Sequence, residues 1–209
     1  MNETGAGKTD TAMIQQTAPT GGRKILDVGC GRNKVPGAIG IDSNPKTDAD
    51  VIHDLGLLPY PFPDNQFDEV VGRHVVEHLP DVMAFISELH RITRPGGRIK
   101  LVTPHYTNPD WPADLTHRNH LNSYSFQYFI PERKLFPFYT ELELKPVRTY
   151  VTLANLWRYL GLEFIVNLDQ HWRAFRCTRK FWEHYLCIFI RGKDLYFEFE
   201  VVKPAPKPS

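Results

Sequence analysis

The sequence has few cysteines, no dominant charge and no long apolar run, and each of these absences excludes a class of protein. Its 209 residues include three cysteines, Cys30, Cys177 and Cys187, which form no Cys-x-x-Cys pair. A disulfide framework is therefore not expected, and a reducing compartment is. Lysine and arginine total 25 against 24 acidic residues, so no overall electrostatic attraction to nucleic acid or to an anionic membrane is expected.

Long hydrophobic segments are also missing. No stretch reaches the roughly 20 apolar residues that span a bilayer, and the N-terminus lacks the apolar core of a signal peptide. We therefore predict a soluble, cytoplasmic protein. The length suits one domain. Residues 1–22, rich in Gly, Thr and Gln, are predicted to form a disordered tail, residues 23–203 a single domain, and residues 204–209 a second tail.

A glycine turn near the N-terminus organises the rest of the chain. Residues 25–31, Ile-Leu-Asp-Val-Gly-Cys-Gly, predict a buried strand that runs into a tight turn, where a ligand can approach the backbone closely. Two nucleotide sites use such a turn: the dinucleotide fingerprint, which has a third glycine, and a shorter loop that holds S-adenosylmethionine (SAM). Lys34 stands where the third glycine would fall, which disfavours the dinucleotide because that glycine lets helix and strand pack closely.

Apolar runs predict strands over residues 24–28, 38–42, 50–54, 67–72 and 98–103. Such a series, with a helix before its last strand, is typical of an α/β fold with an open sheet whose ligands lie at the carboxyl ends of the strands.

That helix is predicted from its spacing and its ends. Asp81 is a suitable N-cap, and residues 94–97, Arg-Pro-Gly-Gly, are a stop signal. Between them, apolar residues recur with helical i, i+3, i+4 and i+7 spacing at Val82, Phe85, Ile86, Leu89 and Ile92.

The connection between the first two strands is unusually short. Residues 32–37 include Pro36 and Gly37, so the helix that normally follows such a glycine turn is expected to be absent or reduced to one turn. Arg32 and Lys34 could replace its dipole in neutralising a ligand carboxylate, or they could simply be solvated.

The C-terminal third is less regular. Residues 105–140 are predicted to be loop and short helix, 142–151 a sixth strand, and 195–202 a final strand. Residues 152–190 are predicted to form a mostly helical insertion between the last two strands. This insertion could be a lid over an apolar or glycan acceptor, an interfacial membrane contact, or buried packing.

Several segments in succession resemble one enzyme family. The runs ILDVGCG, IGID, VIHDL, FPDNQFDEVVGRHVVEHL and ELHRITRPGGRIKLVTP are similar to the class I SAM-dependent methyltransferases, particularly the small bacterial type 11 group, over roughly residues 24–130. The resemblance implies a Rossmann-like, seven-stranded α/β sheet with one antiparallel strand, and an enzyme that uses SAM as its cofactor.

The resemblance also implies which residues hold SAM. Asp42 matches the acid that accepts both ribose hydroxyls, a role that suits a carboxylate because it has two acceptor oxygens. Asp54 matches the position that meets the adenine amino group, with Leu55 beside the ring. The full set of cofactor-binding residues implied is Asp27, Gly29, Cys30, Gly31, Asp42, Asp54, Leu55 and Arg73.

Histidines after the fourth and fifth strands are the candidates for catalysis. The resemblance implies that His74 lies where the fourth strand faces the sulfonium and the acceptor. His117, in a polar irregular segment, is the first choice for a general base, although it could equally fix its loop by hydrogen bonds. We expect Glu77 to shape the SAM pocket or to cap the next helix, and His78 to be structural.

Four residues of the same region are candidates for substrate binding: His105, Tyr106, Arg118 and His120. His105, Asp114, His117 and His120 could also gather a divalent metal, but their spacing matches no metal motif, so no metal is expected.

The acceptor class is narrowed partly by what is missing. No Asn-Pro-Pro-Tyr-like run follows the fourth strand, and no cysteine other than Cys30 lies among the site motifs, which disfavours methylation of DNA bases. We predict transfer of the SAM methyl group to an O or N atom of a small molecule or sugar-containing metabolite. The alternatives are a catalytically silent SAM-binding regulator and a methyltransferase acting on protein or RNA. A peripheral lipid contact stays open, and the oligomeric state is not predicted.

Overall fold

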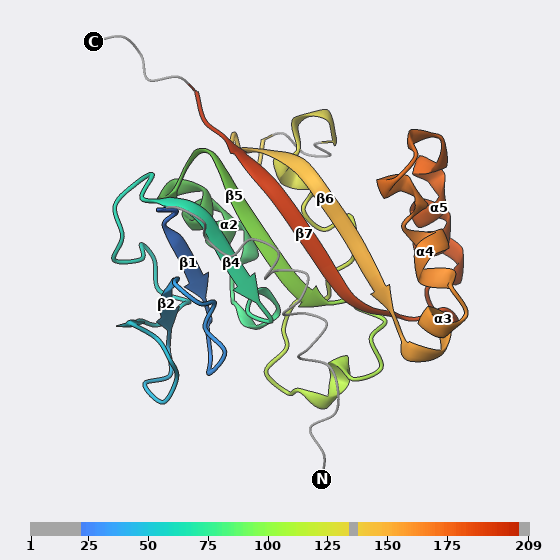
Figure 1. Ribbon diagram of the computed structural model, residues 1–209, viewed down its shortest axis with the longest axis horizontal. Helices are drawn as coiled ribbons and strands as arrows, with labels where there is room; N and C mark the ends of the chain where they lie inside the picture. The colour runs from blue at the N-terminus through green and yellow to red at the C-terminus, as the bar shows by residue number, and fades with distance from the viewer. Residues whose placement is uncertain (1–21, 134–137, 205–209) are drawn as a thin grey trace.

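A seven-stranded mixed sheet forms the centre of the protein (Figure 1). The computed structural model describes residues 22–133 and 138–204. The strand order is β3-β2-β1-β4-β5-β7-β6; β1 to β5 run parallel to one another, and β7 is antiparallel to both β5 and β6. This order confirms the predicted α/β sheet with one antiparallel strand. The strands are β1 (Ile25–Val28), β2 (Ile39–Asp42), β3 (Val51–Ile52), β4 (Phe67–Arg73), β5 (Thr93–Pro104), β6 (Glu143–Leu153) and β7 (Gly192–Val202).

Helices are short apart from one. Those before β6 are η2 (Val76–His78), α2 (Val82–Ile92), η3 (Trp111–Ala113), η4 (Gln127–Phe129) and η5 (Pro131–Arg133). Those between β6 and β7 are α3 (Asn155–Tyr159), α4 (Leu162–Val166), η6 (Leu168–Gln170), η7 (Arg173–Phe175), α5 (Arg176–Phe181) and the π-helix η8 (Trp182–Leu186).

Helix α2 begins where its cap residue predicts. The Asp81 carboxylate accepts a hydrogen bond from the Ala84 N–H at 2.9 Å, which satisfies one of the unpaired donors of the first turn. Its apolar stripe is buried in the core. Residues 94–97 were predicted to be a turn that stops the helix, but in the structure they already belong to β5. Thr93 pairs with Phe67, and the pairing register between β4 and β5 then shifts. Gly96, at φ 72°, gives the backbone the freedom that this irregularity needs.

The sheet has one thickly and one thinly packed face. Leu26 and Val28 point into the large core cluster, together with the buried side of α2, whereas Ile25 points to the other side, as alternation along a strand requires. The second cluster is small: Ile25, Ala38, Val71, Val102 and Tyr196. No helix lies between β1 and β2, where residues 29–38 are all described, in agreement with the prediction from Pro36 and Gly37.

The helices between β6 and β7 fasten onto the edge strand β6. The Asn167 side chain accepts from the Val151 N–H at 2.9 Å and donates to the Val151 carbonyl at 2.7 Å. The Glu163 carboxylate accepts from the Leu153 N–H at 3.0 Å and from the Tyr150 hydroxyl at 2.8 Å. These bonds give polar groups of the edge strand a partner.

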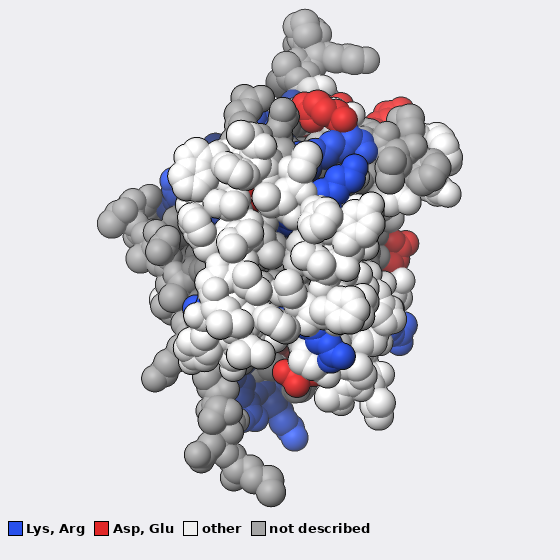
Figure 2. Space-filling model, turned by 90° about the vertical axis from the view of Figure 1, so that its right-hand side faces the viewer, with Lys and Arg blue, Asp and Glu red and all other residues white. Residues whose placement is uncertain are grey.

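The outer side of these helices is apolar. Figure 2, which views the molecule from the side of α3 to α5, shows a face with few charged side chains. The large exposed residues of this segment, hereafter the apolar face, are Leu156, Tyr159, Leu160, Phe164, Ile165, Trp172, Phe175, Phe181, Tyr185, Ile188 and Phe189. None of the helices in the described ranges is both long and apolar enough to cross a bilayer.

The two predicted tails fall almost entirely outside the described part of the chain. Except for residues 22 and 204, the segments 1–22 and 204–209 lie outside the described residues.

Candidate functional site

The glycine turn after β1 leaves room for a ligand beside the backbone. Gly29 and Gly31 adopt φ values of 66° and 56°, a region that favours glycine. A Cβ atom on Gly29 would lie 2.9 Å from Val75 Cγ2, whereas one on Gly31 would meet nothing within 4 Å. The turn is therefore closed against Val75 on one side and open at Gly31, as a site for a bound ligand requires.

Asp42 holds the open side of this turn in place. It ends β2 and is 9% exposed. Its Oδ2 accepts from the Gly31 N–H at 2.9 Å, and its Oδ1 accepts from the Asn44 N–H at 2.8 Å. Each carboxylate oxygen has two lone pairs, so Asp42 can still accept hydrogen bonds from the hydroxyls of a ligand.

A pocket of about 600 Å³ opens at the carboxyl ends of β1, β2 and β4. This is the edge of a parallel sheet where ligands bind in open α/β folds. Its walls bring together predicted residues from five separate segments of the chain, Gly29, Asp42, Asp54, Leu55, His74 and Arg118. The other lining residues were not predicted for this site, and His78 among them was expected to be structural; they are Ser43, Gly56, Leu57, Val75, His78, Leu79 and Pro80.

His74 forms the wall of this pocket after β4. It is a non-glycine residue with a φ of 51°, which costs energy and is typical of functional positions. Its N–H donates to the Val102 carbonyl at 2.8 Å. Its Nδ1 lies 3.4 Å from Oε1 of the fully buried Glu77. The backbone therefore fixes an imidazole at the pocket, next to a carboxylate.

Asp27 and Arg73 bind each other instead of lining the pocket. Arg73 lies 2.9 Å from Asp27 Oδ2, which also accepts from the Val35 N–H at 2.8 Å, and Arg73 donates to the Asn33 carbonyl. Burial raises the pKa of Asp27, against the lowering effect of the Arg73 guanidinium. The pair fixes residues 33–35 beneath the turn, so the predicted cofactor contact of the Arg73 side chain does not fit this geometry.

Asp27 retains one unused acceptor. Its Oδ1 is buried and has no hydrogen-bond partner, which is unfavourable unless a ligand or water supplies a donor. This orphaned oxygen and the open space beside Gly31 fit a ligand with a polar amine or hydroxyl at the turn.

Cys30 is packed beneath the turn. Burial, with the negative charges of Asp27 and Asp42, raises the pKa of its thiol to about 11, and the side chain is not part of the pocket wall. A contact of the Cys30 side chain with the cofactor therefore does not fit this geometry, and a contact of its backbone stays a prediction.

Arg32 and Lys34, the two cationic residues between β1 and β2, contact other protein groups and do not line the pocket. Lys34 Nζ lies 2.9 and 2.8 Å from the two oxygens of Asp50, and this carboxylate raises the pKa of Lys34. Arg32 Nε donates to the Lys46 carbonyl at 3.4 Å. Of the two alternatives considered for these cations, replacement of a helix dipole at the ligand does not fit these contacts, because Asp50 already neutralises Lys34.

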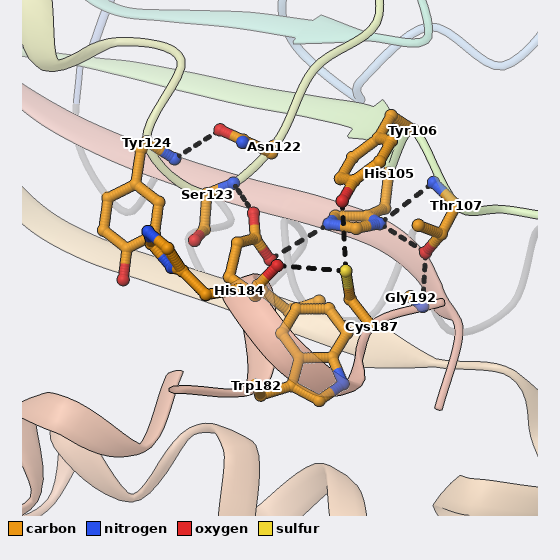
Figure 3. A network of polar contacts seen from close by, with 12 residues as sticks. His105, Tyr106, Thr107, Asn122, Ser123, Tyr124, Trp182, His184, Cys187 and Gly192 are labelled. Carbon is orange, nitrogen blue, oxygen red and sulfur yellow. Dashed lines mark hydrogen bonds and ion pairs between the residues drawn. The ribbon is translucent and has the colours of Figure 1, made fainter. Parts of the chain in front are cut away.

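His105 belongs to a buried polar network (Figure 3) and is not among the residues that line the pocket. Its ring is fully buried, with Nδ1 2.7 Å from Thr107 Oγ1 and Nε2 3.1 Å from Glu183 Oε2. Tyr106 lies beside it, with its hydroxyl 3.0 Å from Cys187 Sγ. Both ring nitrogens of His105 have protein partners, and its predicted substrate contact does not fit this arrangement. Tyr106 is likewise turned towards the insertion.

The remaining predicted residues surround Trp111. His120 stacks on the Trp111 ring at a centroid distance of 3.9 Å. His117 directs Nδ1 to the Trp111 carbonyl at 2.9 Å, and its ring lies 4.8 Å from that of His78. Of the four predicted substrate residues, Arg118 lines the pocket.

The metal set considered from the sequence is not assembled. The His105 ring is engaged by Glu183 and Thr107, whereas Asp114 and His117 lie together, 3.9 Å apart. Glu183 was not identified from sequence, since it lies 78 residues from His105 with no motif between them.

Comparisons with known proteins agree with this geometry. A family model described as a methyltransferase domain matches residues 26–101. A probable S-adenosylmethionine-dependent methyltransferase of Mycolicibacterium smegmatis is 33% identical over 122 residues, which cover 49% of this chain and 48% of the relative. A probable tocopherol O-methyltransferase of rice, Oryza sativa subsp. japonica, is 52% identical over 46 residues, 22% of this chain and 13% of the relative.

The matches to these relatives are partial in length. This chain spans about half of the bacterial relative and a smaller part of the rice protein. The crystal structure of the YcgJ protein of Bacillus subtilis superimposes with a TM-score of 0.56 and 16% identity, over 95% of this chain and all of that chain. At this identity the likeness concerns the fold.

Proposed function

Because residues 26–101 of this chain belong to the class I SAM-dependent methyltransferases, we propose that the protein transfers the methyl group of SAM to an O or N atom of a small-molecule acceptor. The observation that carries the proposal is the pocket in which Gly29, Asp42 and Leu55 meet His74. On one side of the pocket, the glycine turn and the Asp42 carboxylate are suited to bind a nucleoside. On the other side, the His74 imidazole is suited to contact the methyl acceptor.

Residues of the first strands hold the cofactor in this proposal. Asp42 accepts hydrogen bonds from the ribose hydroxyls, Asp54 faces the adenine amino group, and Leu55 packs against the ring. The open side of the glycine turn and the orphaned Asp27 Oδ1 receive the methionine part. When bound, SAM supplies an electrophilic methyl group and its own thioether leaving group, so the protein mainly orients the two reactants.

His74 is the residue best placed to take the proton of the acceptor. It lines the pocket, and imidazole is the side chain that most often acts as a general base. An acceptor hydroxyl would pass its proton to His74 while its oxygen attacks the methyl carbon. His117, the first choice from sequence, is not part of the pocket wall, so it is less well placed to act as the base.

The apolar face favours a lipophilic acceptor, in line with the tocopherol for which the rice relative is named. All three acidic side chains of the insertion are turned inward: Glu163 and Glu183 are 8% and 6% exposed, and Asp169 pairs with Arg179. Arg158, Lys180 and Arg191 are exposed. An exposed surface that is aromatic and cationic suits the interface of an anionic membrane. We therefore propose that the protein collects its acceptor at such an interface.

The test uses His74→Asn. Asparagine tolerates the positive φ of this position but cannot take a proton at neutral pH. Methyl transfer from radiolabelled SAM to quinol and phenol acceptors in vesicles should fall roughly 10²- to 10⁴-fold, with SAM affinity measured by calorimetry unchanged.

Two results would contradict the proposal. Wild-type rates in His74→Asn would remove His74 from the reaction. Tight SAM binding without methyl transfer to any lipophilic or polar acceptor would favour a catalytically silent SAM-binding regulator.

A further inference from the structure

Two histidines and a glutamate converge beside the pocket. Glu77 and His78 lie in η2, and His117 lies in the loop after β5. One potential ligand atom of each residue lies within 4.8 Å of the other two. We propose that Glu77, His78 and His117 bind one divalent first-row transition-metal ion, of which Zn²⁺ is the representative.

Hydrogen bonds hold the two segments of this cluster together. The backbone N–H groups of Arg118 and Asn119 donate to the Glu77 carbonyl at 2.8 and 3.1 Å. The Asn119 side chain donates to the carbonyls of Val76 and Leu79 at 3.0 and 2.8 Å. His117 therefore sits at a fixed place relative to η2, and the three side chains are organised before any ligand binds.

The hydrogen bonds of both imidazoles leave Nε2 as the nitrogen with a lone pair. His117 Nδ1 lies 2.9 Å from the Trp111 carbonyl, which can only accept, so Nδ1 carries the proton. His78 Nδ1 lies 2.8 Å from Thr116 Oγ1, whose own proton goes to the Asp114 carboxylate at 2.6 Å. His78 Nδ1 must then donate as well. Histidines that bind metals usually donate their other N–H to a carbonyl or carboxylate in this way.

Glu77 supplies an independent indication of a ligand. The residue is fully buried, and its Oε2 accepts from the Thr103 hydroxyl at 3.0 Å. Its Oε1 is buried without any hydrogen bond, 3.4 Å from His74 Nδ1. A buried carboxylate oxygen without a hydrogen bond is unfavourable, and a cation bound at Oε1 would remove this cost.

The ligand set determines the kind of ion. Two donors that each lie about 2.1 Å from one tetrahedral ion are about 3.4 Å apart, so ligand atoms that lie within 4.8 Å of one another need to close by at most about 1.4 Å. Imidazole favours zinc and neighbouring transition metals over Mg²⁺ and Ca²⁺, which prefer oxygen ligands. Three protein ligands leave one coordination position open, and His78 lines the pocket, so a hydroxyl or carbonyl of the acceptor could reach it.

Metal binding is tested directly, independently of methyl transfer. Untagged full-length protein is dialysed against a chelator, returned to buffer and titrated with ZnCl₂ in a calorimeter. One equivalent of Zn²⁺ should bind with a Kd in the micromolar range or below. His78→Ala and His117→Ala should each weaken binding at least about 10-fold. Glu77→Gln keeps an acceptor for Thr103 but loses the charge, so it should also weaken Zn²⁺ binding at least about 10-fold. This variant serves as the test if an alanine variant fails to fold.

The control is His171→Ala, which removes an exposed histidine of the insertion and should leave the affinity unchanged. Millimolar Mg²⁺ should not displace the zinc. Three results would overturn the proposal: absence of a saturable site at one equivalent, wild-type affinity in all three variants of the cluster, or displacement of Zn²⁺ by Mg²⁺.

Discussion

His105 Nε2 lies 3.1 Å from Glu183 Oε2, and this contact joins the end of β5 to the π-helix η8. Both side chains are almost fully buried, at 0% and 3% exposure. Glu183 Oε1 also accepts from the Ser123 N–H at 2.9 Å. One carboxylate therefore connects three segments that are distant in the sequence, and the insertion is tied to the segment that carries Arg118.

Removing this carboxylate should destabilise the fold. Glu183→Ala leaves the buried His105 Nε2 and the Ser123 N–H without their common partner, and we expect a loss of roughly 3 kcal/mol in the free energy of unfolding, measured with urea. Glu183→Gln keeps an acceptor and should cost less. The exposed Glu141→Ala is the control, with a change below about 0.5 kcal/mol. Equal losses in Glu183→Ala and Glu141→Ala would show that the buried contact contributes no stability.

Asp42→Ala should weaken SAM binding by about 2 kcal/mol, roughly 30-fold, because the ribose hydroxyls lose charge-assisted acceptors. Calorimetry measures this change. Asp42→Asn keeps one oxygen for the Gly31 N–H and should lose less. Asp48, exposed in the same loop, provides the control variant Asp48→Ala. If Asp42→Ala retains wild-type affinity, Asp42 does not contact the cofactor.

Arg73→Met should destabilise the protein more at neutral than at acidic pH. Asp27 would then be buried without its cation, a situation that typically costs 3–5 kcal/mol. Burial already raises the pKa of Asp27, and loss of Arg73 would raise this pKa further. When a carboxyl has a higher pKa in the folded than in the unfolded state, its contribution to the free energy of unfolding is lost as pH rises through the folded-state pKa. The loss measured by urea unfolding should therefore shrink as pH falls below it; a loss independent of pH would exclude Asp27 as the cause.

The three cysteine thiols should react with a labelling reagent at different rates. Burial raises the pKa of Cys30 to about 11 and also raises the pKa of Cys187, and thiolate is the reactive form. Cys177 is exposed. At pH 8 an aromatic disulfide reagent should label one thiol per chain rapidly, and Cys177→Ser should abolish this fast phase. Rapid labelling of two thiols would show that the turn around Cys30 opens readily.

The apolar face should bind anionic vesicles. Replacing Tyr159, Phe181 and Phe189, which are 88%, 54% and 75% exposed, by serine should reduce sedimentation with phosphatidylglycerol vesicles at least about 10-fold. Phe138→Ser, at a 77% exposed position outside this face, is the control. Unchanged sedimentation of the triple variant would show that the apolar face does not contact lipid.

Local signals in the sequence predicted the parts of the fold that depend on neighbouring residues. The Asp81 cap, the apolar spacing of α2 and the missing helix at Pro36 act within a few residues of chain, and the structure confirms them. The pocket was also largely predictable, since motif residues at strand ends meet at one edge of a parallel sheet.

Side-chain direction was not predictable in the same way. Arg73 comes directly after a predicted strand, at the edge of the sheet where the pocket lies. Its side chain nevertheless pairs with Asp27, because a buried carboxylate is a stronger partner than solvent or a ligand. His105 was placed in the site because it follows β5, but its partner Glu183 comes from the insertion, whose packing has no local signature. Such contacts depend on tertiary arrangement, which the spacing of residues does not specify.

The pairing of Asn167 with the backbone of Val151 has a consequence for self-association. A strand at the border of a sheet is a template for a strand of another molecule, and here an amide side chain imitates the bonds that such a strand would make. With these bonds in place, the insertion would hinder pairing of β6 with a strand of another molecule. A shortened protein lacking residues 154–191 would expose this border, and aggregation would result even with the pocket intact.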